Sequence, residues 1–226
     1  TARNRFMSNE KGLALLSGGL DSTVALAMGC REYELFTALF FDYGQIASAR
    51  EIKASSEIAR RFGIEFECIE LRWLGNLSSS YIIGAEAGAG LSQSCGAPDL
   101  WVENRNGIFL NVAAAVAVSR GCSVVIAGFN REEAEEFPDN STEYLEAVNR
   151  ALDLGERSRV RVESPTVSLD KKEIVREGID LGVPWELIWS CYRGGDLMCG
   201  QCASCLRLRN AVDGTEVEEI IRFKGE

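Results

Sequence analysis

The chain has 226 residues, enough for one α/β domain with a sizeable core, and its 46% hydrophobic and 26% charged content excludes a disordered protein. Its formal net charge of −10 disfavours tight, sequence-independent nucleic-acid binding, because such binding depends on Lys and Arg side chains that neutralise phosphates. The absence of histidine excludes His-based triads and acid–base catalysis by His.

The sequence shows no membrane or secretion signal. The apolar run at 108–118 is broken by polar residues and is too short to span a bilayer, and no signal peptide is visible. We therefore expect a cytoplasmic protein without a membrane partner. Residues 1–6 precede Met7 and are expected to be a short extension or an expression remnant, which leaves a single domain over residues 7–226.

Hydrophobic patterning predicts strands that alternate with helices along the chain. The predicted strands are 12–16, 34–41, 65–71, 123–127 and 160–164, and the predicted helices are 21–28, 48–62, 104–119, 141–154 and 170–181, with a short helix at the C-terminal end. Asp170 with Glu173 predicts a capping box. The helix at 104–119 is apolar on nearly every side and is expected to be buried. This order predicts an α/β, Rossmann-like fold with a parallel five-stranded sheet, helices on both faces and ligands at the carboxyl ends of the strands.

Two segments interrupt this alternation. Residues 72–103 are rich in Gly, Ser and Ala with weak periodicity, which is typical of a functional lid or a partner-facing insert. Residues 130–140 are expected to be a polar loop after the fourth strand.

A glycine-rich turn joins the first strand to the first helix. Its two glycines allow a sharp turn that exposes backbone N–H groups, and the helix N-terminus adds partial positive charge, so it predicts a phosphate-binding loop. The Ser17 and Ser22 hydroxyls can donate to phosphate, whereas Asp21 is expected to hold Mg²⁺ on the phosphates. The loop lacks the Lys of a Walker A motif. The residues expected to bind the nucleotide here are Leu16, Ser17, Gly18, Gly19, Leu20, Asp21, Ser22 and Thr23.

Four of the eight cysteines crowd into fifteen positions, as Cys191, Cys199, Cys202 and Cys205. Without a secretion signal, clustered Cys indicates a metal before a disulfide, and four thiolates suit a tetrahedral structural Zn²⁺. The expected metal-binding segment covers about 188–212. A [4Fe–4S] cluster, a disulfide pair and a redox Cys-x-x-Cys remain alternatives.

The run Ser17-Gly18-Gly19-x-Asp21-Ser22 after an N-terminal strand resembles the signature of the PP-loop ATP pyrophosphatase superfamily. The resemblance implies an adenine nucleotide α hydrolase-like fold. It also implies that ATP is cleaved between its α and β phosphates and that AMP is passed to a carbonyl or carboxyl oxygen.

Several stretches together resemble one family of that superfamily, the 7-cyano-7-deazaguanine synthases. They are, in order, 17–22, Asp42-Tyr43-Gly44-Gln45, Arg105-Asn106-x-x-Phe109-Leu110, Gly128-x-Asn130, Pro138-Asp139, and Ser190-Cys191-Tyr192 with the three later cysteines. The resemblance implies an ATP-dependent, AMP-forming C–N ligase of queuosine and archaeosine precursor synthesis. Such an enzyme adenylates 7-carboxy-7-deazaguanine, lets ammonia form the amide, and uses a second ATP to form the nitrile.

Site residues follow from the same resemblance. It implies catalytic roles for Asp21, Ser22 and Arg105. The planar guanidinium of Arg105 is expected to form paired hydrogen bonds with phosphate or with the substrate carboxylate. Nucleotide contacts are expected from Tyr43 and Gln45. The residues expected to bind the deazaguanine are Arg105, Asn106, Asn130 and Asp139. The implied cofactors are Mg²⁺ and Zn²⁺ alongside ATP, and the implied assembly is a homodimer.

The sequence departs from the family at Glu135-Glu136 and Asn140, where relatives carry small residues and a Cys, and at 46–48, which lacks basic residues. A first alternative is therefore a ligase that joins the adenylated acid to another amine and stops at an amide. A second is a tRNA-thiolating enzyme with Cys95 as sulfur carrier, and a third is a nucleotide-binding regulator without catalysis. The acidic chain disfavours the second, and the charged groups at Asp21 and Arg105 disfavour the third.

Overall fold

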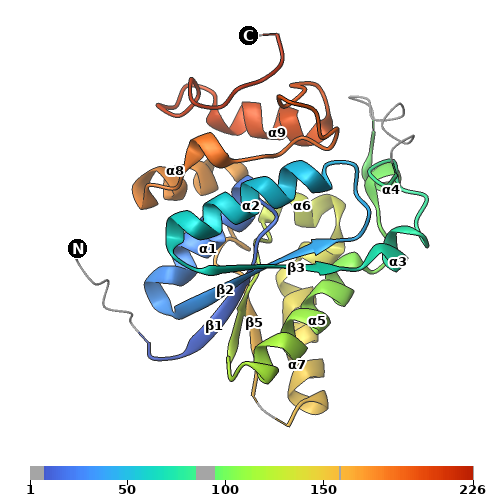
Figure 1. The fold of residues 1–226 in the computed structure, drawn as a ribbon, viewed down its shortest axis with the longest axis vertical. Coiled ribbons are helices and arrows are strands. Elements are labelled where there is room, and N and C mark those ends of the chain that lie inside the picture. The colour runs from blue at the N-terminus through green and yellow to red at the C-terminus, as the bar shows by residue number, and fades with distance from the viewer. Residues whose placement is uncertain (1–7, 85–94, 158, 226) are drawn as a thin grey trace.

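Five parallel strands form the centre of the molecule. The computed structural model describes residues 8–84, 95–157 and 159–225. The sheet order is β3-β2-β1-β4-β5, and every neighbouring pair is parallel, as predicted (Figure 1). The strands are β1 (Lys11–Leu15), β2 (Glu34–Asp42), β3 (Glu65–Glu70), β4 (Val124–Ile126) and β5 (Arg161–Glu163).

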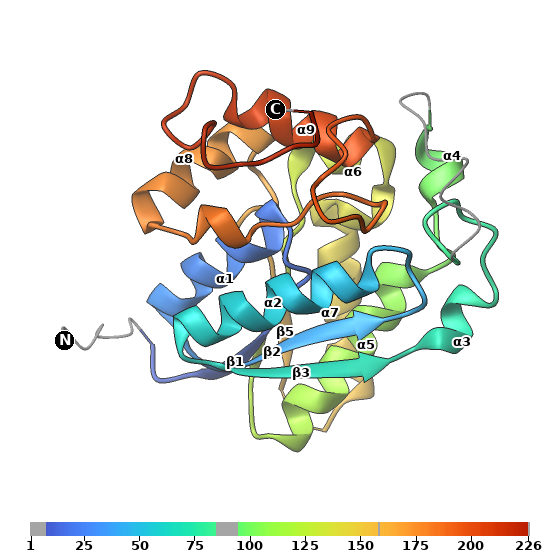
Figure 2. The ribbon, with the colours of Figure 1, turned by 45° about the horizontal axis from the view of Figure 1, so that its top comes forward.

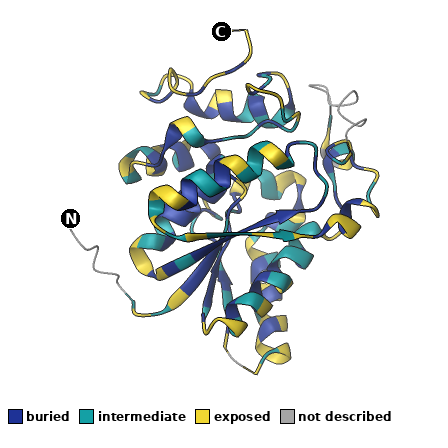
Figure 3. Cartoon of the chain, viewed as in Figure 1, coloured by how far each residue is buried: buried dark blue, intermediate teal, exposed yellow. Residues whose placement is uncertain are grey.

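Helices cover both faces of the sheet, which confirms the Rossmann-like prediction (Figure 1). On one face, α1 (Leu20–Glu32) and α2 (Ser48–Phe62) bury side chains such as Leu26 and Ile58 against the strands. On the other face, α5 (Arg105–Ser119) and α7 (Thr142–Gly155) pack on the strands through side chains such as Leu110. The inner strands β1, β2 and β4 are covered from both sides and are almost entirely buried, whereas no residue of the edge strand β3 is fully buried (Figure 3).

Helix α5 is buried on one face only. Leu110, Ala113, Ala114 and Ala117 are buried against the sheet, whereas Asn111 is exposed on the far side. The prediction that this helix is buried therefore holds only for the face on the sheet, because small alanines on the other face reach the surface without forming a large apolar patch. Within the described residues no helix is long and apolar enough to cross a membrane.

The C-terminal quarter of the chain forms a second hydrophobic cluster with α1. It contains α8 (Lys171–Leu181), the 3₁₀ turn η3 (Trp185–Leu187) and α9 (Ala203–Val212), which lie together beyond α1 and α2 (Figure 2). Asp170 and Glu173 form the predicted capping box, and Gly182 ends α8 in a left-handed conformation.

The segment at 130–140 is not the loop predicted from the sequence. It folds into α6 (Arg131–Glu136) and the 3₁₀ turn η2 (Pro138–Asn140). The Asn130 side chain accepts a hydrogen bond from the Glu133 backbone N–H at 2.9 Å and so caps α6, and acidic residues occupy its first turn. With no apolar face to mark it, this helix gave no periodicity signal.

The insert at 72–103 carries short α3 (Arg72–Gly75) and α4 (Ala97–Leu100). Residues 85–94 of this predicted lid, like the predicted extension at 1–6, lie outside the described residues.

The strand order changes side at β1: β2 and β3 follow on one side of it and β4 and β5 on the other, so the parallel strands β1 and β4 end side by side. After β4, Gly128 lies directly against the turn that follows β1. A Cβ on Gly128 would stand 2.6 Å from the Ser22 backbone nitrogen and 2.8 Å from the Asp21 carbonyl carbon. Only a residue without a side chain fits this contact, which sets the glycine-rich turn against β4.

Gly128→Ala should therefore destabilise the fold by about 1–3 kcal/mol, because backbone atoms of the turn must move. The control is Gly155→Ala at the exposed end of α7, where a Cβ meets no atom within 4 Å and stability should be unchanged or slightly raised. Urea unfolding of both variants measures the difference. Equal stability of the two variants would show that the close approach at Gly128 does not constrain the turn.

Candidate active site

A cavity of about 260 Å³ opens at the carboxyl ends of β1, β2 and β4, between α1, α2, α5 and the C-terminal segment. This is the position predicted for ligands of a parallel sheet. The predicted site residues that line it are Leu16, Ser17, Gly19, Leu20, Asp21, Ser22, Tyr43, Gln45, Arg105 and Asn106. The other predicted contacts, Gly18, Thr23, Asn130 and Asp139, are not among its lining residues.

The glycine-rich turn is held by its own hydroxyls. The Thr23 hydroxyl donates to the Gly19 carbonyl at 2.7 Å, and the Ser22 hydroxyl donates to the same carbonyl at 3.2 Å. Gly18 has a φ of +78°, and a Cβ there would stand 2.8 Å from the Ala54 Cβ. Gly18 and Thr23 thus shape the turn from outside the cavity. No side chain caps the N-terminus of α1, so its first N–H groups face the cavity and can bind an anion.

Lys171, which the sequence analysis missed, lies at the centre of the charged groups of this cavity. Its Nζ contacts Asp21 Oδ2 closely and Glu133 Oε1 at 2.8 Å, and only 8% of the residue is exposed. Burial opposes the charge on Lys171, but the two carboxylates outweigh it and raise the lysine pKa. The sequence did contain a signal for Lys171. A Lys in the first turn of a helix is unfavourable next to the positive end of the helix dipole, so a compensating interaction is expected there.

Asp21 has one oxygen without a partner. Its Oδ1 is buried and accepts no hydrogen bond from the described residues, while Oδ2 binds Lys171. Burial raises the pKa of Asp21 because the carboxylate loses solvation. A buried, unsatisfied carboxylate oxygen at the cavity wall is the kind of ligand that a hard cation accepts. The residues present therefore fit a Mg²⁺ ion carried by phosphates.

The opposite wall combines a cation with aromatic rings. Arg105 Nη1 donates to the Tyr43 hydroxyl at 3.3 Å, and its guanidinium lies 5.8 Å from the Tyr43 ring centre. Phe109 stacks on Phe41 with the ring centres 4.5 Å apart. Among the described residues no carboxylate lies within ion-pair distance of Arg105, so the guanidinium can pair with an anionic ligand.

Beside this wall the buried Gln45 pairs with the half-buried Glu51. Gln45 Nε2 donates to the Phe41 carbonyl at 3.1 Å and to Glu51 Oε2 at 2.9 Å, and Gln45 Oε1 accepts from the Tyr43 N–H at 3.0 Å. Every polar atom of the Gln45 side chain is thus used within the protein, and the residue fixes the turn after β2. Burial raises the pKa of Glu51 to about 7. Glu51 was missed because it lies in an ordinary amphipathic helix.

In the segment 130–140, the residues that line the cavity are not the predicted Asn130 and Asp139. Asn140 and Glu133 line the cavity, whereas Glu135 and Glu136 are exposed and Glu136 pairs with Arg207 at 2.8 Å. Asn106 Nδ2 donates to the backbone carbonyl of Asp139 at 3.4 Å.

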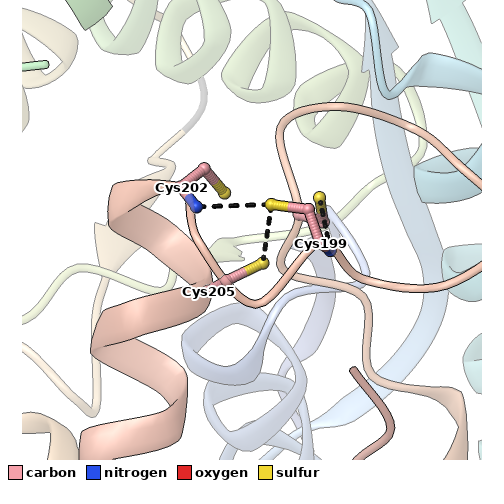
Figure 4. A group of neighbouring side chains, drawn as sticks. Cys199, Cys202 and Cys205 are labelled. Atoms are coloured by element: carbon pink, nitrogen blue, oxygen red, sulfur yellow. Dashed lines mark hydrogen bonds between the residues drawn. The ribbon is translucent and has the colours of Figure 1, made fainter. Parts of the chain in front are cut away.

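The four clustered cysteines converge as predicted. Their sulfur atoms all lie within 4.8 Å of one another, and none of the four forms a disulfide. Backbone N–H groups point at the sulfurs, as from Cys202 to Cys199 Sγ at 3.3 Å, and Cys199 and Cys205 approach to 3.8 Å (Figure 4). Four convergent sulfurs with N–H donors suit a metal held by thiolates.

The cysteine segment also builds one wall of the cavity. Trp189, Ser190 and Tyr192 precede or follow Cys191, and all three line the cavity. The backbone N–H of Trp189 donates to the Gly18 carbonyl at 2.9 Å, so this segment is hydrogen-bonded directly to the glycine-rich turn. A metal at the cysteines would therefore fix the wall and leave the cavity itself free.

Comparisons with known proteins agree with this arrangement. The family described as "Queuosine biosynthesis protein QueC" matches residues 11–215. The 7-cyano-7-deazaguanine synthase of Desulforudis audaxviator is 48% identical over 89% of this chain and 96% of its own length. That of Carboxydothermus hydrogenoformans is 46% identical over 91% of this chain and 99% of its own.

Among solved structures, the U34-tRNA thiolase NcsA from Methanococcus maripaludis with its [4Fe-4S] cluster aligns with a TM-score of 0.51 at 17% identity. The alignment covers 81% of this chain and 60% of the thiolase. Because the sequence identity is so low, the similarity shows a shared fold and nothing more. The matched residues include the glycine-rich turn, the cavity walls and all four clustered cysteines, so the chain belongs to the QueC family of queuosine biosynthesis proteins.

Proposed function

We propose that this protein converts 7-carboxy-7-deazaguanine to 7-cyano-7-deazaguanine with ATP and ammonia. The observation that carries the proposal is one cavity that joins a phosphate-binding turn to an arginine free of carboxylate partners and an aromatic wall. Relatives that match almost the whole chain carry the name of this activity.

The chemistry explains why such a site suffices. A carboxylate is a poor electrophile, because its carbon is electron-rich and its leaving group would be oxide. Transfer of AMP to the carboxylate provides a good leaving group, which ammonia then displaces to give the amide. A second ATP activates the amide oxygen in the same way, and loss of AMP leaves the nitrile. Both steps require positioning and charge stabilisation more than a covalent nucleophile.

The nucleotide phosphates are assigned to the turn and the first N–H groups of α1, with Ser17 and Ser22 as hydroxyl donors. Asp21 is assigned to Mg²⁺ through its unpartnered Oδ1. When bound, the ion offsets phosphate charge. Lys171 lies next to Asp21 and is placed to bind the same phosphates.

The substrate is assigned to the opposite wall. Arg105 would pair with its carboxylate or with a phosphate, since the guanidinium has no carboxylate partner in the described structure. Phe109 and Tyr43 offer ring faces on which a flat base can stack. Asn106 lines this wall and can read the base or ribose. Tyr43 and Gln45 as adenine contacts, and Asn130 and Asp139 as base contacts, stay predictions.

Of the departures from the family, Glu135 and Glu136 give the amide-forming alternative no support, because both side chains are exposed and lie outside the cavity lining, whereas Asn140 does line the cavity. The two glutamates form a solvated helix face, the common place for charged side chains. A homodimer and a cytoplasmic location also stay predictions.

The direct test is incubation with Mg-ATP, ammonium and 7-carboxy-7-deazaguanine, followed by mass analysis of the products. We expect AMP, pyrophosphate and the nitrile. AMP with product that stops at the amide would support the alternative ligase, and the absence of AMP would overturn the proposal.

Asp21→Asn should lower AMP formation on the order of 10²–10³-fold, because the site loses a ligand for the phosphate-bound cation. Folding should survive, since Lys171 keeps its contact with Glu133. Asp153→Asn, an exposed position on α7, provides a control with the same loss of charge. If Asp21→Asn forms AMP at the wild-type rate, Asp21 does not have the assigned role.

We assign the cysteine site to a structural Zn²⁺, because all four positions of a tetrahedral ion would be filled by protein sulfur. The metal content should be one zinc per chain, and Cys202→Ser or chelation should lower both metal content and melting temperature. Cys68→Ser, an exposed cysteine on β3, should change neither. Iron in place of zinc, or a melting temperature that stays the same after the metal is removed, would refute this assignment.

A further inference from the structure

The proposed reaction needs a proton acceptor. Near neutral pH ammonia exists mostly as ammonium, which has no free electron pair with which to attack carbon. The attacking nitrogen must lose protons to become a neutral amide, and the amide nitrogen must lose its remaining protons to become a nitrile. The usual group for this task is histidine, and the chain contains none.

Among the described residues, seven titratable side chains line the cavity, and six of them are unsuited to accept a proton. Lys171 and Arg105 are cations, and Asp21 and Glu133 are both bound to Lys171. The hydroxyls of Tyr43 and Tyr192 stay protonated, because burial raises both pKa values, that of Tyr192 to about 12. The titratable side chains of this set are Asp21, Tyr43, Glu51, Arg105, Glu133, Lys171 and Tyr192. Glu51 remains.

Glu51 is held in place by one of its two oxygens. Oε2 accepts from Gln45 Nε2 at 2.9 Å, and Gln45 is itself anchored to the backbone of Phe41 and Tyr43. Among the described residues no other hydrogen bond to the Glu51 carboxylate is formed, so Oε1 is free to accept from a ligand in the cavity that the residue lines.

The charges around Glu51 suit a base that works near neutral pH. Burial disfavours the charged carboxylate and raises its pKa to about 7, and Asp42 on β2 acts in the same direction. The Gln45 hydrogen bond and the Arg105 guanidinium on α5 oppose the rise. Tyr43 faces it as a neutral hydroxyl. A carboxyl that titrates near the working pH is present as the base and still binds a proton well.

We propose that Glu51 is the catalytic base that takes the proton from the attacking nitrogen, an assignment that rests on the proposed function. As nitrogen bonds to the substrate carboxyl carbon, the C–O bond to AMP breaks and AMP leaves with the electron pair. An ammonium ion gives up one proton before its nitrogen attacks and a second as the amide forms, and each passes to Glu51 and then to water. The amide nitrogen then loses one proton when its oxygen is adenylated and the other as the last C–N bond forms and AMP leaves with the C–O electron pair; Glu51 takes each proton in turn and returns it to water. No oxidant or reductant is needed.

The test separates proton transfer from adenylation. Glu51→Gln keeps the size of the side chain and an oxygen that accepts from Gln45. Amide formation from ammonium should fall roughly 10²–10⁴-fold, while exchange of pyrophosphate into ATP in the presence of the acid persists. Hydroxylamine, which is mostly unprotonated at neutral pH, should trap the adenylated acid at a rate much closer to that of the wild type.

The pH profile gives a second readout. In the wild type, single-turnover amide formation measured at a constant concentration of free ammonia should rise as pH increases through about 7, because Glu51 becomes ionised. Glu51→Gln should lose this rise, and Glu51→Asp should restore part of it. Glu57→Gln, on the same helix but outside this cavity, removes the same charge and should behave as wild type.

Two outcomes would overturn the role of Glu51 alone. One is a Glu51→Gln variant that forms amide from ammonium at the wild-type rate with the same pH profile. The other is a variant that loses pyrophosphate exchange together with amide formation, which would indicate a structural role. A wild-type protein that forms no AMP from this acid would instead overturn the proposed function, and the role of Glu51 with it.

Discussion

The Nζ atom of Lys171 lies between the carboxylates of Asp21 and Glu133, residues that stand 150 and 38 positions away in the sequence. A buried ammonium group is tolerated only when it is paired, so the lysine draws together the three segments that carry these side chains. They are the start of α1 after the glycine-rich turn, the short helix α6 and the start of α8. The shape of the cavity at the edge of the sheet depends on this contact.

The cysteine cluster supports the same cavity from the other side. A metal at four sulfurs would hold a segment that has little regular structure before α9, and that segment supplies Trp189, Ser190 and Tyr192 to the cavity wall. The backbone N–H of Trp189 donates to the carbonyl of Gly18 in the turn. Stability of the cysteine cluster and shape of the cavity are thereby linked, although no cysteine of the cluster lines the cavity.

Net charge and local charge act separately in this protein. The chain is strongly acidic, yet its cavity presents Lys171 and Arg105 to a ligand. Because exposed charges are screened within about 10 Å at 0.1 M salt, the surface acids have little effect on a phosphate inside the cavity. Inside the cavity, loss of solvation dominates instead, which is why the carboxyl groups of Asp21 and Glu51 have raised pKa values. An acidic chain can therefore bind anionic substrates.

Local sequence determined the sheet, its strands and most of its helices, since apolar runs and caps such as Asp170 with Glu173 act over a few residues. It also determined the glycine-rich turn and the metal-binding cysteines, because their chemistry lies in short spacings. The sequence did not show α6, whose only signals are the Asn130 cap and acidic residues. Nor did it show the roles of Lys171 and Glu51. A lysine in a helix and a glutamate in an amphipathic helix look like solvated charges until the tertiary structure buries them. Burial joins residues far apart in the chain and changes their pKa values, and only the folded structure determines which charges become buried.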